Sequence, residues 1–124
     1  MKILIVDDHT DMRRTLRTII DAVSERSHEF IECSDGQEAV DQFALHRPDI
    51  VIMDVRLKTV DGFTAVEKMM ELRPDPRVIF ITAHDSPSVR ERAARLHALG
   101  FVSKDNLMEL RSFISAVSSS PKGG

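Results

Sequence analysis

The stretch that decides the fold, residues 48–62, has the sequence PDIVIMDVRLKTVDG. It holds a continuously apolar run from Ile50 to Met53, which is typical of a central parallel strand covered on both faces. Asp54 follows this run directly. Asp61 is the expected N-cap of a helix, because its side chain can accept from the first free backbone N–H groups. The stretch therefore predicts a strand that ends at a carboxylate and leads into a helix.

Further apolar runs lie on both sides of this stretch and alternate with helical patterns. The second run contains Glu32 and the fifth is short, so both are predicted to be edge strands. The alternation predicts an α/β fold with a parallel sheet and right-handed crossovers. The predicted strands are Ile3 to Val6, Phe30 to Cys33, Ile50 to Met53, Val78 to Ile81 and Phe101 to Ser103.

Helices are predicted between and after these strands. The second begins at Asp35, and Pro48 blocks its extension. The fourth has Ser86 as its cap and Pro87 at its first position, and Gly100 is expected to stop it. Apolar residues at helical spacing predict the first helix (Met12, Leu16, Ile19 and Val23) and the fifth (Leu107, Leu110, Ile114 and Val117).

The bulk properties favour one domain and exclude several classes of protein. We expect a domain at residues 1–117 and a flexible tail or linker stub at 118–124. The net charge of −3 argues against direct nucleic-acid binding. The single cysteine, Cys33, cannot form an internal disulfide and is expected to be a small buried hydrophobe. No run has the length of a membrane span, so we expect a cytoplasmic protein without a membrane partner.

Polar groups follow the predicted central strands, where ligands bind in such sheets. Asp7 and Asp8 follow the first strand and Asp54 the third, so three carboxylates would meet at one edge. A hard cation, Mg²⁺ or Mn²⁺, would relieve their repulsion. Thr82 and Lys104 follow the fourth and fifth strands and could hold phosphoryl oxygens. Because Asp54 ends the central strand, it is the candidate nucleophile.

Basic residues on the predicted first helix have a simpler interpretation. Arg13, Arg14 and Arg17 recur along it. Charged residues at such positions usually form a solvated helix face, and we expect the same here.

The sequence resembles a known family in its most specific segments. They are KILIVDDH (2–9), PDIVIMDVRLKTVDG (48–62), VIFITAHD (78–85) and ALGFVSK (98–104). With them, residues 1–117 resemble the receiver domain of bacterial two-component response regulators. The DDH start and the Lys-Asp pair are similar to regulators with a helix-turn-helix output domain. The resemblance implies a flavodoxin-like (βα)₅ fold, a doubly wound parallel sheet of strand order 2-1-3-4-5.

The resemblance also implies roles for the residues at the strand ends. Asp54 is implied as the phosphoacceptor. Asp8 and Asp54 are implied as direct metal ligands, with Asp7 in support and the backbone carbonyl of Arg56 as a further ligand.

The other implied roles concern the switch and the lifetime of the phosphorylated state. Thr82 and Phe101 are implied as the switch pair, and Lys104 as the phosphate-binding lysine. Arg56 and His84 are implied to flank the path of the water that removes the phosphoryl group.

The implied partners follow from this chemistry. The donor would be a phosphohistidine on a sensor histidine kinase or a histidine phosphotransfer protein. Phosphorylation would change the surface formed by the fourth helix, fifth strand and fifth helix, which would bind a downstream output protein or domain or support a phosphorylation-dependent dimer. The chain would not be an enzyme beyond its self-catalysed phosphorylation and slow self-dephosphorylation.

Two positions depart from the family pattern, and alternatives remain open. Lys58 and Asp105 stand where the family often has proline, the second through a cis bond, so the position of Lys104 is open. An aspartate-nucleophile phosphatase would have aspartate in place of Arg56. A flavodoxin-like cofactor carrier would not place Asp7 and Asp8 beside a phosphate. An inactive receiver that serves only as a scaffold is a further alternative.

Overall fold

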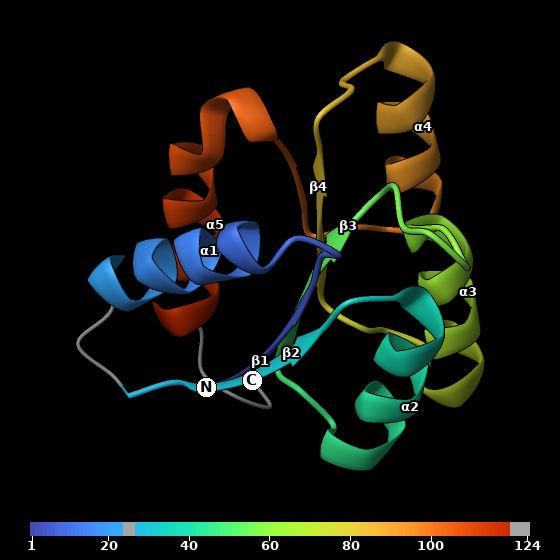
Figure 1. The fold of residues 1–124 in the computed structure, drawn as a ribbon, viewed down its shortest axis with the longest axis horizontal. Helices are drawn as coiled ribbons and strands as arrows, with labels where there is room; N and C mark the ends of the chain where they lie inside the picture. Colours follow the sequence, from blue (N-terminus) through green and yellow to red (C-terminus); the bar gives the residue numbers. More distant parts are fainter. Residues whose placement is uncertain (24–26, 120–124) are drawn as a thin grey trace.

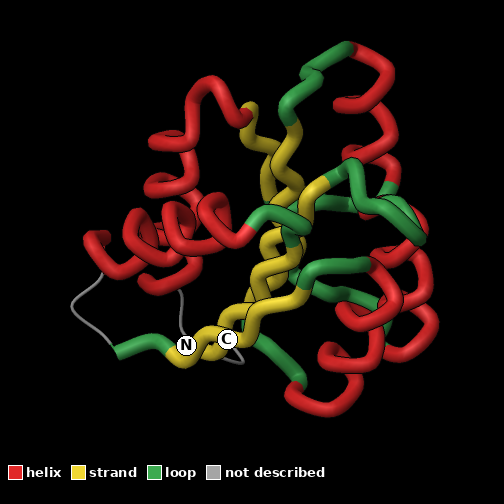
Figure 2. The backbone as a smooth tube through the Cα atoms, viewed as in Figure 1, coloured by secondary structure: helices red, strands yellow, loops and turns green. Residues whose placement is uncertain are grey.

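The computed structural model describes residues 1–23 and 27–119, which form one parallel sheet with helices on both faces (Figures 1 and 2). The strands are β1 (Lys2–Val6), β2 (Glu29–Cys33), β3 (Ile50–Asp54), β4 (Val78–Thr82) and β5 (Gly100–Ser103). The helices are α1 (Thr10–Val23), α2 (Gly36–His46), α3 (Gly62–Leu72), α4 (Pro87–Arg95), the 3₁₀ helix η1 (Lys104–Glu109) and α5 (Leu110–Ser119).

The strand order is β2-β1-β3-β4-β5, so the predicted α/β class, strand order and edge strands are confirmed. Helices α1 and α5 cover one face of the sheet, and α2, α3 and α4 cover the other (Figure 1). Alternate strand residues face opposite layers: Leu4 belongs to the core beneath α2 and α3, whereas Ile5 belongs to the core beneath α1 and α5. Both are fully buried, as expected for a strand covered on two sides.

The parallel register aligns the carboxyl ends of the strands. Val6 pairs with Met53, and Asp54 pairs with Ile81. On the next pair of strands, Thr82 at the end of β4 pairs with Ser103 at the end of β5. Since all these strands run in the same direction, the residues that end them or come directly after them gather at one edge of the sheet.

Local capping confirms the predicted helix starts. Asp35 accepts a hydrogen bond from the backbone N–H of Glu38 at 2.8 Å, and Asp61 accepts one from Thr64 at 2.8 Å. Ser86 caps α4, whose first residue is proline. A side-chain cap of this kind stabilises a helix by about 1 kcal/mol.

The predicted end of the fourth helix was wrong. Helix α4 ends at Arg95, and Gly100 is instead the first residue of β5. The chain leaves the helix through His97, which has a φ of 56°. Gly100 has a different role: a Cβ there would lie 2.7 Å from the ring of Phe113. The absence of a side chain lets α5 approach the strand.

The predicted fifth helix is divided in two. Leu107 lies in η1, and the non-helical backbone of Asn106 (φ −142°, ψ 57°) bends the chain there, so α5 begins at Leu110. Ser118 and Ser119 were predicted to lie in the tail but are the last residues of α5. The rest of that tail, 120–124, lies outside the described residues.

Cys33 is buried, as predicted, and burial together with the nearby Glu38 carboxylate raises the pKa of its thiol to about 12.

No helix within residues 1–23 and 27–119 has the length and apolar character needed to cross a membrane.

Candidate functional site

A buried charge cluster lies at the carboxyl edge of the sheet. Among the described residues, the buried polar and charged ones are Asp7, Asp54 and Thr82. The Lys104 Nζ atom lies 3.0 Å from Oδ2 of Asp7 and 3.2 Å from Oδ2 of Asp54. One ammonium group therefore joins strand ends that are far apart in the sequence, at the sheet edge where these residues were predicted to meet.

Burial and charge determine the protonation of this cluster. Burial and the Asp7 charge raise the pKa of Asp54 to about 6, although the charge of Lys104 opposes the shift. Burial lowers the pKa of Lys104, but the carboxylates of Asp7 and Asp54 more than offset this effect and raise it overall. At neutral pH the cluster therefore holds an ionised Asp54 beside a charged lysine.

Asp7, Asp8 and His9 form a compact group of ligand atoms. One ligand atom of each lies within 4.8 Å of the others. Oδ2 of Asp7 and Oδ1 of Asp8 are buried and accept no well-aligned hydrogen bond from the described residues. Their neighbours are cationic or titratable nitrogens: Nζ of Lys104 at 3.0 Å and Nδ1 of His9 at 2.9 Å, respectively. Buried carboxylate oxygens with unused acceptor capacity fit a hard cation such as Mg²⁺.

Arg13 supports the site through contacts that the sequence analysis missed. Its side chain was expected on a solvated helix face, but only 15% of it is exposed. It donates to the backbone carbonyl of Asp7 at 2.6 Å and to Glu32 at 3.0 Å. Arg13 therefore fixes the loop that carries the acidic pair. Glu32, a lone charge in the apolar run of β2, was the available signal that a cation would pack against this strand.

The residues predicted to modulate lifetime contribute backbone groups to the site. The backbone N–H of Arg56 donates to Oδ1 of Asp54 at 3.3 Å, and that of His84 donates to Oγ1 of Thr82 at 3.0 Å. The side chains of Arg56 and His84 are exposed. They thus lie at the rim of the site and have room to move.

The predicted switch pair lies on one face of the sheet. Phe101 pairs with Phe80, two residues before Thr82, and side chains two apart on a strand share a face. Phe101 is half-buried, and the guanidinium carbon of Arg90 lies 4.7 Å from its ring centroid. Arg90 also binds Asp85 through two hydrogen bonds of 2.7 Å. One arginine thus joins the loop after β4, helix α4 and the phenylalanine of β5.

The departure after Lys104 does not displace the lysine. The described residues contain no cis peptide bond. Asp105 instead donates its backbone N–H to Oγ of Ser103 at 3.2 Å. This turn directs Lys104 into the pocket without the proline that the family often has there.

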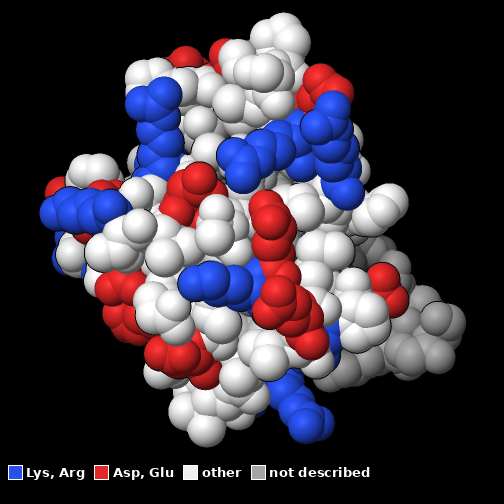
Figure 3. Space-filling model, turned by 90° about the vertical axis from the view of Figure 1, so that its right-hand side faces the viewer, with Lys and Arg blue, Asp and Glu red and all other residues white. Residues whose placement is uncertain are grey.

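Charge is unevenly distributed outside the site. Figure 3 shows basic side chains gathered at the level of α4 and acidic side chains below them at the level of α3. Arg92 of α4 joins the two groups, since its guanidinium lies 4.0 Å from Asp61 and 3.7 Å from Glu67. Exposed pairs of this kind contribute about 0–1 kcal/mol, so they orient α4 only weakly.

The fold and the buried cluster define a doubly wound α/β domain with an acidic site at its carboxyl edge. Residues 3–115 match the family described as response regulator receiver domain. The chain therefore belongs to the response regulator receiver domains of two-component systems. This membership favours a receiver domain over an aspartate-nucleophile phosphatase or a flavodoxin-like cofactor carrier.

Two relatives of this chain are longer than it and are named for different activities. The chain is 27% identical to the transcriptional regulatory protein DegU of Brevibacillus brevis, over 100% of this chain and 51% of the relative. It is 35% identical to a protein-glutamate methylesterase/protein-glutamine glutaminase of Caldanaerobacter subterraneus, over 84% of this chain and 28% of the relative. The chain therefore spans about half, or less, of the length of these relatives.

A solved structure matches the fold closely. The CheX–CheY–BeF₃–Mg²⁺ complex from Borrelia burgdorferi contains a chain that matches with a TM-score of 0.84 and 26% identity. The match covers 97% of this chain and 90% of that chain.

Because the pKa of Asp54 is raised, a substitution that removes its charge is predicted to stabilise the folded protein. The folded protein binds this proton more tightly than the unfolded chain, whose pKa is near the ordinary 3.8. Ionisation at neutral pH therefore costs stability, and that stability returns as the pH falls through about 6 toward 4. In buffer without divalent cations at pH 7.5, Asp54→Asn should be more stable than the parent by about 1–3 kcal/mol.

Urea unfolding at pH 7.5 and pH 5 measures this difference. The gap should narrow at the lower pH, because Asp54 of the parent is then largely protonated. Asp41→Asn, at an exposed position of α2, is the matched control and should change stability at neither pH. A destabilised Asp54→Asn protein at pH 7.5 would contradict the proposed cost of ionisation.

Proposed function

We propose that the chain accepts a phosphoryl group on Asp54, with a divalent cation, Mg²⁺ or Mn²⁺, in the adjacent acidic pocket. The observation that carries the proposal is the position of Lys104, whose ammonium group bridges the buried carboxylates of Asp7 and Asp54. Asp8, Asp54 and the backbone carbonyl of Arg56 would ligate the cation, with Asp7 in support. When bound, such an ion neutralises phosphoryl oxygens.

The residues of this chain suit the transfer chemistry. The carboxylate of Asp54 attacks phosphorus, an oxygen–phosphorus bond forms, and the phosphorus–nitrogen bond to a donor histidine breaks. The histidine leaves as a neutral imidazole: the released nitrogen keeps the electron pair of the broken bond, and the other ring nitrogen keeps the proton that it carried in the donor. Lys104 would hold one phosphoryl oxygen, and the Thr82 hydroxyl would donate to another, since its oxygen already accepts from the backbone N–H of His84.

The donor and the output are proposed from the family. A sensor histidine kinase or histidine phosphotransfer protein would supply the phosphoryl group, and a downstream protein or domain would respond. The Borrelia complex contains a receiver-like chain with BeF₃ and Mg²⁺, which supports a cation and a phosphoryl group in this fold. The transcriptional relative supports a DNA-binding regulator as the output, and the methylesterase relative supports a different output.

The proposed switch rests on Thr82 and Phe101. A phosphoryl group on Asp54 would draw the Thr82 hydroxyl toward it, and the vacated space would let Phe101 turn inward. That rotation would remove the ring from beneath Arg90, whose bonds to Asp85 connect it to the loop after β4. The surface of α4, β5 and α5 would therefore change.

The test of the proposal is phosphorylation itself. Incubation with a small-molecule phosphodonor and Mg²⁺ should add one phosphoryl group, visible by mass spectrometry of the intact protein. Chelation of the metal should prevent it. Asp54→Asn should remain unmodified because an amide oxygen is a poor nucleophile, whereas Asp41→Asn should react like the parent. A chelator-insensitive phosphoprotein in the Asp54→Asn variant would assign the reaction to another residue.

The switch predicts that phosphorylation and response can be separated. Thr82→Ala should still accept the phosphoryl group but should lose most of the response of α4, because a ligand shifts an equilibrium only through contacts that differ between the two states. NMR shifts of the α4 backbone amides, recorded with and without phosphodonor, measure the response. Equally large shifts in Thr82→Ala and the parent would refute the coupling.

The rim residues predict a long-lived phosphorylated state. Neither Arg56 nor His84 offers the carboxylate or amide that best orients an attacking water, and both can hold phosphoryl oxygens by charge. The double variant Arg56→Asn/His84→Glu should lose phosphate about tenfold faster, a barrier change of about 1.4 kcal/mol. Each single variant should lie between, and Lys58→Asn serves as an exposed loop control. An unchanged decay rate in the double variant would show that these positions do not set the lifetime.

A further inference from the structure

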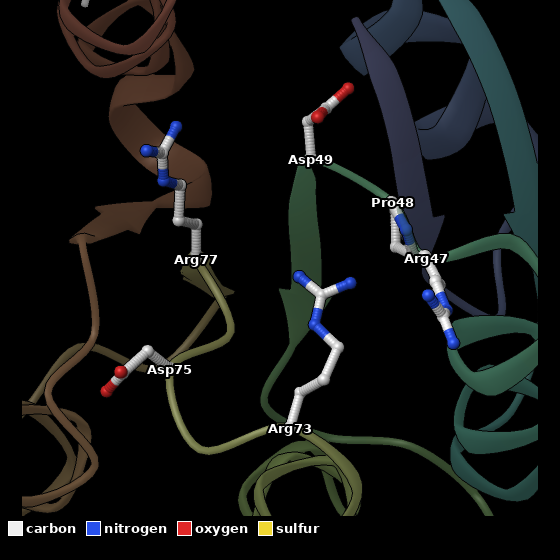
Figure 4. A pocket seen from close by; sticks show the side chains of 6 residues that line it. All are labelled: Arg47, Pro48, Asp49, Arg73, Asp75 and Arg77. Atoms are coloured by element: carbon white, nitrogen blue, oxygen red, sulfur yellow. The ribbon is translucent and has the colours of Figure 1, made fainter. Parts of the chain in front are cut away.

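A cavity of about 270 Å³ lies at the amino edge of the sheet, opposite the proposed phosphorylation site. It is formed where α2 and α3 end and where β3 and β4 begin. Figure 4 shows the side chains around it. Its lining residues are Arg47, Pro48, Asp49, Arg73, Asp75 and Arg77.

The arginines of this cavity have unused hydrogen-bonding capacity. No ion pair of Arg47, Arg73 or Arg77 is formed within residues 1–23 and 27–119. The Asp49 carboxylate accepts from the backbone N–H of Lys2 at 2.7 Å. In Figure 4 the Asp75 carboxylate points away from the guanidinium of Arg73. Arg47, Arg73 and Arg77 thus line the cavity without an ion pair to a carboxylate of the described residues.

Helix ends explain only part of this arrangement. Arg47 and Arg73 are the C-caps of α2 and α3, where positive charge is favourable against the helix dipole. That effect uses the charge of the guanidinium groups and leaves their N–H donors unpaired. Arg77 precedes β4 and belongs to no helix end. A role at helix termini therefore does not account for the third arginine.

A second cavity, of about 360 Å³, is lined by Phe43, Ala44 and Leu72 together with two arginines of the basic one. Arg47 and Arg73 line both, and the guanidinium of Arg73 lies 5.0 Å from the ring centroid of Phe43. Leu72, also at this cavity, is 54% exposed. The joined cavities, which we call the basic groove, thus offer anion-binding donors beside an apolar wall.

The chemistry of the basic groove distinguishes between anions. Helix C-termini carry partial negative charge, and Asp49 and Asp75 add to it, so a dense polyphosphate is disfavoured. Carboxylates spaced along a chain can each meet a guanidinium from a different element, with the paired geometry that arginine provides. An adjacent apolar side chain would cover Leu72, which is exposed.

We propose that the basic groove binds an acidic peptide segment with apolar side chains next to its carboxylates. The groove lies at the opposite end of the sheet from Asp54, so binding does not require phosphorylation. The proposal therefore stands apart from the proposed function, and its test uses the unphosphorylated full chain.

The test is an NMR titration with a blocked peptide of alternating glutamate and leucine. Amide shifts should be confined to residues 43–47 and 72–77. Arg73→Gln/Arg77→Gln should weaken binding about tenfold through the loss of charge-assisted hydrogen bonds. Arg77→Gln alone, which touches no helix end, should weaken it measurably. Arg111→Gln on α5, an exposed arginine, is the charge-matched control and should change affinity less than about twofold.

Other results would overturn the proposal. One is equal binding of a peptide with glutamine in place of glutamate, and another is equal weakening by Arg111→Gln, which would indicate non-specific charge attraction. Tighter binding of inorganic phosphate than of the peptide would assign the groove to phosphate. Thermal unfolding measures the stability of the arginine variants. Reduced stability together with unchanged affinity for the peptide would show that the arginines act only at the helix ends.

Discussion

Two carboxylates share one buried pocket in this domain, and the ammonium group of Lys104 lies between them. Burial of like charges is costly unless a cation compensates them, and removal of Lys104 would leave both carboxylates without that cation. The arrangement of the sheet meets this constraint, because the parallel register brings the ends of β1, β3 and β5 to one edge. Arg13 makes a second connection, because it donates to the backbone carbonyl of Asp7 and to the side chain of Glu32 on the edge strand β2.

The buried residues of the site and the exposed side chains around them differ in how far the core fixes their positions. Asp7, Asp54 and Thr82 are enclosed between two apolar layers, so their positions result from the packing of the core. Arg56 and His84 contribute backbone N–H groups to these residues but keep exposed side chains. The domain thus presents a preorganised centre and a rim whose side chains are not held by the packing of the core.

Sequence patterns predicted the parts of this fold that depend on local composition. Apolar runs located all strands with their ends shifted by one residue at most, because a strand buried on both faces needs such a run. The end of α4 and the bend before α5 depend on the backbone angles of His97 and Asn106, which no periodicity encodes. Arg13 escaped prediction for a different reason: its partner Glu32 lies on another element, so the contact exists only in the folded chain.

The contact of Arg90 with Asp85 and Phe101 differs from the buried centre in its exposure to the solution. Mobile ions screen charges at the surface over a Debye length of about 8 Å at physiological salt, but they screen enclosed pairs much less. Asp85 and Arg90 are both exposed, whereas Asp7 and Asp54 are enclosed. Added salt is therefore expected to weaken the Asp85–Arg90 pair more than the acidic pocket, so the environment can act on the contact of Arg90 with Phe101 separately from the chemistry of the domain.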